Sequence, residues 1–182
     1  TSDAHAGLKA AVKAILPGSG WQRCRVHFAR NVTQKIGSAR SKPVNALIST
    51  IFAQTTTEAV LAQYKAVTDS LRASFPEIAA MLEAAEPDLT AFAPLPREHW
   101  QKVWSNNPIE RLNREIKRRA DVVQIFPDRD SVTRLIGAVL QEQHEEWGYG
   151  ERRYFSDISM RNLIRTLNEH TEPARPELSL TA

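Results

Sequence analysis

The sequence predicts a mainly α-helical protein with at most one or two short strands. Apolar side chains recur at three- and four-residue intervals through residues 43–89, which is the spacing of buried helix faces. The alternation typical of a strand is confined to a short run that starts at Trp21. No internal repeat or low-complexity tract interrupts this pattern. The 182 residues suit one domain or two small ones.

A first helix is expected to follow Ser2 or Asp3, because either side chain can cap a helix N-terminus. Pro17 and Gly18 end this helix, since both residues break regular structure. Its buried stripe is expected to consist of Leu8, Ala11, Val12 and Ile15.

The segment 21–26 alternates loosely between polar and apolar side chains and is predicted to be a short strand. A second helix is expected from His27 to near Gly37, where glycine ends it. The chain therefore begins with two helices and a strand between them.

Residues 43–89 are expected to form three amphipathic helices that pack into a small bundle. Pro76 suits the first turn of the third helix. A proline-punctuated connection then runs from Pro87 to Pro96. The buried faces are expected to consist of Val44, Leu47, Ile48, Ile51 and Phe52, then Val60, Tyr64, Val67 and Leu71, and finally Ile78 and Leu82.

The last part of the chain is also predicted to be helical. Pro108 opens one helix, and Asp128 or Asp130 can cap the next. A weaker helix begins at Ser156, and the polar tail after Thr171 is expected to fray. The longer of these helices is expected to bury Val132, Leu135, Ile136, Val139, Leu140 and Trp147.

The charge of the chain is mildly basic and unevenly spread. The formal net charge is +3. Residues 1–31 and residues 111–119 each carry five basic side chains and one acidic side chain. The stretch between them, 32–100, is nearly neutral, with six basic and seven acidic side chains. A partner with a phosphate backbone would meet the two basic regions if the fold brings them together.

Several classes of protein are disfavoured by what the sequence lacks. The single cysteine, Cys24, excludes an internal disulfide and an all-cysteine metal site, and it fits a cytoplasmic protein. No apolar run is long enough to span a bilayer, and no signal peptide opens the chain. There is no Gly-rich phosphate loop and no serine in a hydrolase elbow.

Glu110 has two possible roles that the pattern alone leaves open. Asn107 is a good N-cap and Pro108 suits the first helical position, so Glu110 falls at the capping-box position. In that case its side chain would turn back to the backbone of the cap. Alternatively, the carboxylate points outward and holds a metal ion.

The helical wheel places Glu110 on a polar face with Asn113, Arg114 and Lys117. This face is either a solvated set of ion pairs or a surface that contacts nucleic-acid phosphates. The neighbouring stripe, which is expected to be buried, consists of Ile109, Leu112 and Ile116.

Four other positions carry possible chemistry. Asp3 is either a helix cap or a carboxylate at the end of a strand that points into a metal site. Cys24 and His27 have the spacing of half a zinc site, but no second half is visible, so buried structure is the alternative. His144, beside two glutamates, is interpreted as part of a solvated helix face.

Four blocks of sequence, in order, resemble the Mutator-type bacterial insertion-sequence transposases. They read SDAHAGL, WQRCRVHFARNV, WSNNPIERLNREIKRR and VVQIFPDRDSVTRL followed by EW, and the resemblance covers roughly residues 1–155. It implies a ribonuclease H-like α/β core interrupted by an all-α insertion. The division implied is 1–31 in the core, 32–100 as the insertion, 101–155 as the return to the core, and 156–182 as a C-terminal tail.

The resemblance also implies an Asp–Asp–Glu triad that binds Mg²⁺ or Mn²⁺, with Asp3 as the second aspartate and Glu110 as the glutamate. The first aspartate of the family would lie upstream of Asp3, so the chain is expected to be a C-terminal fragment that is inactive alone. The C-x-x-H element matches Cys24 and His27, which are expected to order the site or contact DNA. The other residues implied in the site are Arg30, Asn107 and Asn113.

The expected partners are the ends of an insertion sequence and the target DNA, with a homo-oligomer as the active complex and no membrane. The side chains expected to contact the DNA backbone are Arg114, Lys117, Arg118 and Arg119. The rival hypothesis is a non-catalytic helical module for DNA binding or assembly, in which Glu110 is only a cap.

Overall fold

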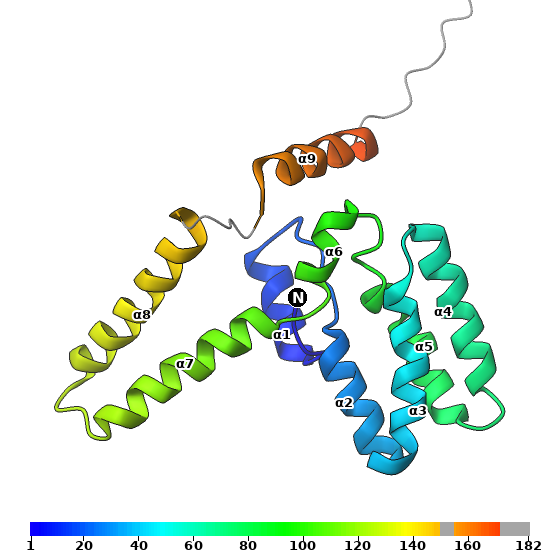
Figure 1. The fold of residues 1–182 in the computed structure, drawn as a ribbon, viewed down its shortest axis with the longest axis horizontal. Coiled ribbons are helices and arrows are strands. Elements are labelled where there is room, and N and C mark those ends of the chain that lie inside the picture. The colour runs from blue at the N-terminus through cyan, green and yellow to red at the C-terminus, as the bar shows by residue number, and fades with distance from the viewer. Residues whose placement is uncertain (150–154, 172–182) are drawn as a thin grey trace, which may run out of the picture.

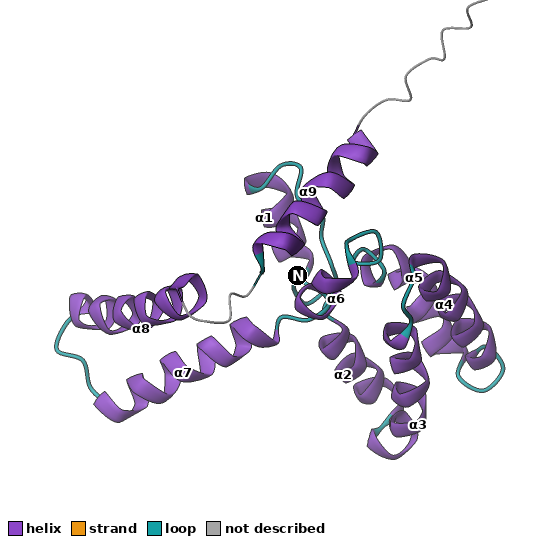
Figure 2. Cartoon of the chain, turned by 45° about the horizontal axis from the view of Figure 1, so that its top comes forward, coloured by secondary structure: helices purple, strands orange, loops and turns teal. Residues whose placement is uncertain are grey.

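The computed structural model describes residues 1–149 and 155–171, and this part of the chain is mainly helical, with no strand (Figure 2). The predicted mainly α fold is confirmed. The elements are α1 (Ala6–Ile15), α2 (Arg25–Ile36), α3 (Ser38–Ser49), the 3-10 helix η1 (Thr50–Ala53), α4 (Thr57–Leu71), α5 (Pro76–Leu89), α6 (Arg97–Val103), α7 (Asn107–Val123), α8 (Arg129–Tyr149) and α9 (Asp157–Thr171).

Helices α2 to α6 share one hydrophobic core, which runs from Phe28 to Trp104 (Figure 1). The predicted faces of the three middle helices are buried there, with Leu47 packed at the edge. Tyr64 lies fully inside this core and its hydroxyl donates to the carbonyl of Leu82 over 2.7 Å. Burial raises the pKa of Tyr64, because the phenolate is poorly solvated there.

An aromatic cluster joins the end of this core to the segment before α7. The ring of Phe92 stacks on Phe52 at a centroid distance of 5.7 Å and meets Trp100 and Trp104 edge-on at 5.0 and 5.5 Å. Such arrangements are the preferred ones for aromatic pairs. Trp104 is therefore fixed in the core, and α7 begins only three residues later.

Helices α7 and α8 form a hairpin that extends away from the core (Figure 1). The prediction of fully buried apolar faces on these helices is wrong. Ile109 is 51% exposed, and of the residues described in α8 only Val139 is buried. Two helices can cover only the stripes that face each other. Asp128 acts as the predicted cap of α8, since its carboxylate accepts from the N–H of Ser131 over 2.6 Å.

The start of the chain differs from the sequence prediction. Helix α1 is capped at His5, not at Ser2 or Asp3, and none of its side chains is buried. The reason is an isolated parallel β-bridge between Ser2 and Arg23, which holds the first residues extended. The strand predicted over 21–26 is reduced to this bridge, because α2 already begins at Arg25.

Helix α9 lies against α6. The carbonyl of Ser159 is 2.9 Å from Nε2 of His99, and the His99 ring stacks on Phe155 at 4.9 Å. The predicted tail beyond Thr171 lies outside the described residues. Within residues 1–149 and 155–171, every helix is too short or too polar to cross a membrane.

The core should tolerate shortening of a surface leucine but not of a central one. Leu82 is fully buried in α5, whereas Leu61 in α4 is 42% exposed. We expect Leu82→Ala to lower the free energy of unfolding by about 2–5 kcal/mol, because it leaves a cavity. The matched control Leu61→Ala should change it by roughly 0.5 kcal/mol or less. Urea unfolding followed by circular dichroism checks this, and equal losses would contradict the assigned core.

Candidate active site at the start of α7

Three segments meet where α7 begins: the extended start of the chain, the first turn of α2 and the residues before α7. The N–H of Cys24 donates to the carbonyl of Ser2 over 2.8 Å. The next N–H, of Arg25, donates to the carbonyl of Trp104 over 2.9 Å. The hydroxyl of Thr1 donates to the carbonyl of Val103. These bonds bring together segments that are up to 102 positions apart in the sequence.

Glu110 does not close a capping box. Helix α7 starts at Asn107, its N-cap is Asn106, and no side chain bonds to the N-terminal backbone. The prediction that Asn107 is the N-cap is wrong by one position, since the N-cap is Asn106. The sequence could not distinguish the two, because both residues are asparagines and either suits the role. The carboxylate of Glu110 turns to α2 instead, where Oε1 lies 3.2 Å from Nε2 of His27 and Oε2 lies 3.8 Å from Nη2 of Arg30.

The surroundings of His27 assign its proton. Arg30 Nη1 lies 3.4 Å from Nε2 of His27, a contact that would be a hydrogen bond only if Nε2 carried no proton. An unprotonated Nε2 would then face the Glu110 carboxylate, 3.2 Å away, with two acceptors opposed. We therefore place the proton on Nε2. Nδ1 is buried and has no hydrogen-bond partner among the described residues.

Cys24 contacts the same helix one turn earlier. Its side chain is fully buried, and its Sγ–H donates to Oδ1 of Asn106 over 3.1 Å. Asn106 was not among the site residues expected from the sequence. Within the described residues, no cluster of three or more His, Cys, Asp or Glu side chains is placed to hold a metal ion.

Asp3 follows the β-bridge and is half-buried. It does not cap α1; its Oδ1 accepts from the adjacent N–H of Ala4 over 2.7 Å. Ser2, next to it, is bonded to Cys24, which in turn contacts the N-cap of α7. The segment carrying Asp3 is thus tied to the start of the Glu110 helix. That the two carboxylates share a cation stays a prediction.

The four basic side chains of α7 that were expected to contact DNA fall into two groups. Arg118 and Arg119 bind Glu115, with N–O distances of 2.7 to 2.9 Å, and Arg119 also binds Glu142 at 2.8 Å. These hydrogen bonds lower the pKa of Glu115 to about 2.

The second group, Arg114 and Lys117, is exposed and forms no ion pair within the described part of the chain. Asn107 and Asn113 are exposed as well. Of the four cations expected to contact DNA, these two are therefore the ones not already neutralised by an acidic neighbour.

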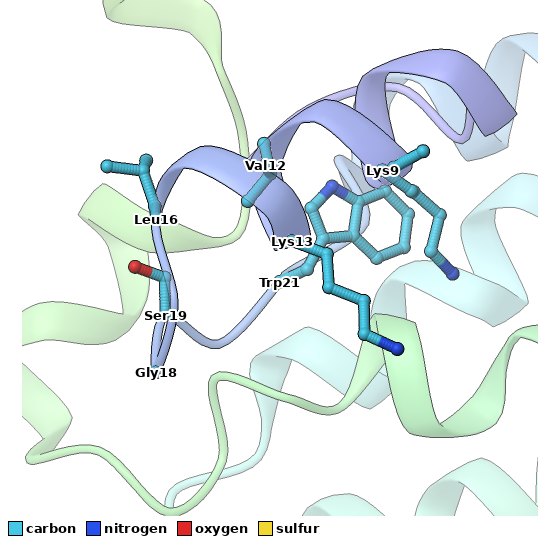
Figure 3. Close-up of a pocket in the computed structure, with 8 residues that line it drawn as sticks. Lys9, Val12, Lys13, Leu16, Gly18, Ser19 and Trp21 are labelled. Atoms are coloured by element: carbon cyan, nitrogen blue, oxygen red, sulfur yellow. The ribbon is translucent and has the colours of Figure 1, made fainter.

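A second basic and aromatic feature escaped the sequence analysis. A hollow of about 490 Å³ lies beside α1, and Figure 3 shows Lys9 and Lys13 on the same side of that helix, next to the Trp21 indole. The ammonium of Lys9 sits 4.2 Å from the Trp21 ring and 2.9 Å from Asp88. The four-residue spacing of the lysines was the available signal. Since Asp88 neutralises Lys9, only Lys13 adds uncompensated charge.

Comparison with known proteins gives a consistent result. The chain matches the family described as "Transposase, Mutator family" over residues 1–150. It is 48% identical to the transposase for insertion sequence element IS1081 of Mycobacterium tuberculosis, over the whole chain and 43% of that transposase.

Two further relatives are more distant. The transposase for insertion sequence element IS256 in transposon Tn4001 of Staphylococcus aureus is 36% identical over 85% of the chain and 40% of its own length. The transposase for insertion sequence element IS406 of Burkholderia multivorans is 38% identical over 82% of the chain and 39% of its own length. The chain spans about two-fifths of the length of these relatives, and it belongs to the Mutator family of insertion-sequence transposases.

Proposed function

We propose that this chain supplies two carboxylates, Asp3 and Glu110, to the active site of a metal-dependent DNA transposase. The observation that carries the proposal is the direction of the Glu110 side chain. It leaves its own helix terminus and enters a polar cluster with His27 and Arg30. A capping role would have required the opposite direction.

The residues fit a hard divalent cation such as Mg²⁺ or Mn²⁺. Such ions prefer carboxylate oxygens and keep several waters, so few protein ligands suffice. The side chain of Glu110 is 26% exposed, and the ion pair of its Oε2 with Nη2 of Arg30 is long, at 3.8 Å. Asp3 uses Oδ1 in one hydrogen bond. Each carboxylate thus keeps an oxygen available. A bound pair of cations would activate the attacking oxygen and stabilise the leaving oxygen of a phosphodiester.

The chain's other residues position the DNA. Arg114 lies four residues and Lys117 seven residues after Glu110, so both follow the same side of α7. Cations there neutralise phosphates without reading sequence. They would hold the backbone beside the carboxylates, so that water and later a 3′-hydroxyl attack in line during cleavage and strand transfer.

We further propose that residues 1–31 and 101–155 belong to a ribonuclease H-like core, that 32–100 is an all-α insertion and that 156–182 is a tail. The hydrophobic core of α2 to α6 supports a compact helical unit in the middle of the chain. The parallel bridge between Ser2 and Arg23 supports an α/β neighbour, since parallel pairing is typical of such cores.

A second candidate is a non-catalytic module for DNA binding or assembly. It is favoured by the exposed apolar side chains of the α7–α8 hairpin, since such surfaces mark interaction sites. Those side chains include Ile109, Val122, Val123, Ile125 and Leu140. A homo-oligomer as the active complex agrees with both candidates.

The substitution Glu110→Gln, made in a full-length transposase that contains this sequence, distinguishes the catalytic candidate from the non-catalytic one. We expect cleavage of insertion-sequence ends in Mg²⁺ to fall on the order of 10³-fold, because a metal ligand worth several kcal/mol is lost. Binding to the same DNA should persist. Gel assays of cleavage and mobility shift measure both. Glu58→Gln, an exposed acid in the first turn of α4, is the control and should cleave normally. Normal cleavage by Glu110→Gln would favour the non-catalytic candidate.

The division of the α7 cations predicts unequal effects on DNA affinity. Arg114→Ala or Lys117→Ala should each weaken binding and reduce the slope of log affinity against log salt by about 0.9, because one phosphate contact is lost. Arg118→Ala should change the slope less, since its guanidinium is held by Glu115. Fluorescence anisotropy between about 50 and 200 mM salt checks this. Over that range, a protein that makes several phosphate contacts loses about 10³-fold or more in affinity for DNA. Slopes unchanged from the parent for Arg114→Ala and Lys117→Ala would show that these side chains do not contact the DNA backbone.

A further inference from the structure

We propose that Cys24 and His27 are positioning residues that together fix the rotation of α7 and so aim the Glu110 carboxylate. The inference rests on the proposed function, in which Glu110 binds a cation. It assigns the C-x-x-H element a mechanical role, without zinc and without contact to DNA.

The two contacts match in spacing on both helices. Cys24 is the N-cap of α2, and His27 is the third residue of that helix, so the two side chains lie on one side of its first turn. Their partners, Asn106 and Glu110, are four positions apart, which places them one turn apart on one side of α7. Two contacts a turn apart fix both the position of a helix and its rotation about its own axis.

Few other contacts within the described residues constrain that rotation. None of the residues of α7 is buried, and the N-terminus of the helix has no side-chain cap. Its packing partner, α8, belongs to the same projecting hairpin (Figure 1). Within the described residues, the contacts that join the start of α7 to the core include the backbone bond at Trp104, the bond between Cys24 and Asn106, and the contact between His27 and Glu110.

A histidine suits this task better than a fixed cation. With a proton on Nε2, the imidazole donates to Oε1 of the carboxylate and orients it, which leaves Oε2 open for a metal ion. Arg30, by contrast, is 58% exposed and lies 3.8 Å from Oε2, so it is the looser neighbour. The carboxylate is held on its Oε1 side and open on its Oε2 side.

The opposite possibility is that His27 competes with the metal ion for Glu110. A measurement of Mn²⁺ affinity distinguishes this competition from the positioning role. In a full-length transposase containing this sequence, free Mn²⁺ is titrated and measured by EPR spectroscopy. We expect His27→Ala to weaken Mn²⁺ binding by about 10- to 100-fold, the usual effect of losing a residue that orients a ligand. Unchanged or tighter binding would overturn the proposal.

Two amide variants provide a matched pair that also serves if His27→Ala fails to fold. The Nε2 amide of His27→Gln can reach Glu110, whereas the shorter His27→Asn cannot. We expect Gln to restore Mn²⁺ affinity to within about threefold and Asn to bind about tenfold more weakly or worse. Equal affinities for the two would overturn the positioning role. His144→Ala, on the exposed face of α8, is the control and should bind normally.

Cys24 is tested in the same way. Cys24→Ser keeps a donor for Asn106 and should retain binding, whereas Cys24→Ala should weaken it. Failure of the proposed function itself looks different: Glu110→Gln would then bind Mn²⁺ and cleave DNA as the parent does. If Glu110→Gln is inactive but every variant of Cys24 and His27 binds Mn²⁺ normally, the positioning role alone is wrong.

Discussion

The arrangement of the site depends on how Trp104 is held. Its side chain is buried in the aromatic cluster with Phe92, and its carbonyl accepts the first N–H of α2, from Arg25. The Arg25 guanidinium also lies 4.2 Å from the Trp104 ring. The core therefore sets the distance between the first turns of α2 and α7. The contacts between α2 and α7, including the approach of His27 to Glu110, require this spacing, because side chains reach only a few ångströms beyond their helices.

The sequence was most informative where each helix has a partner in the same chain. The stripes through Val44, Tyr64 and Leu82 predicted the core because these helices cover one another. The same reasoning failed for Ile15 and Ile109, which are more than half exposed. Periodicity says which face of a helix avoids water, but it does not say whether another element covers that face. The fold class was therefore predictable, and the burial of α1 and α7 was not.

The candidate site was predictable to a similar degree. Its main residues, Glu110 and His27, came from the motif blocks, but their direct contact joins positions 83 apart and needed the fold. Asn106 was missed because Asn107 is equally suited to a cap. The pairing of Arg118 with Glu115 was visible in principle, since residues three apart share a helix face. The acid within the basic run was counted, but its pairing with neighbouring arginines was not considered when these side chains were expected to contact DNA.

Side-chain exposure increases across the site from Cys24 to Arg30, and the role that each residue can play depends on its exposure. Cys24 is fully buried, and the side chains of His27 and Glu110 are 20% and 26% exposed, whereas that of Arg30 is 58% exposed. A group without access to solvent cannot meet a DNA backbone, so the inner residues act through contacts within the protein. A group at the outer edge pays little desolvation and remains free to meet phosphate. Glu110 stands between the two, close enough to the core to be held and open enough to bind a hydrated cation. This intermediate exposure agrees with the proposed role of Glu110 as a metal ligand.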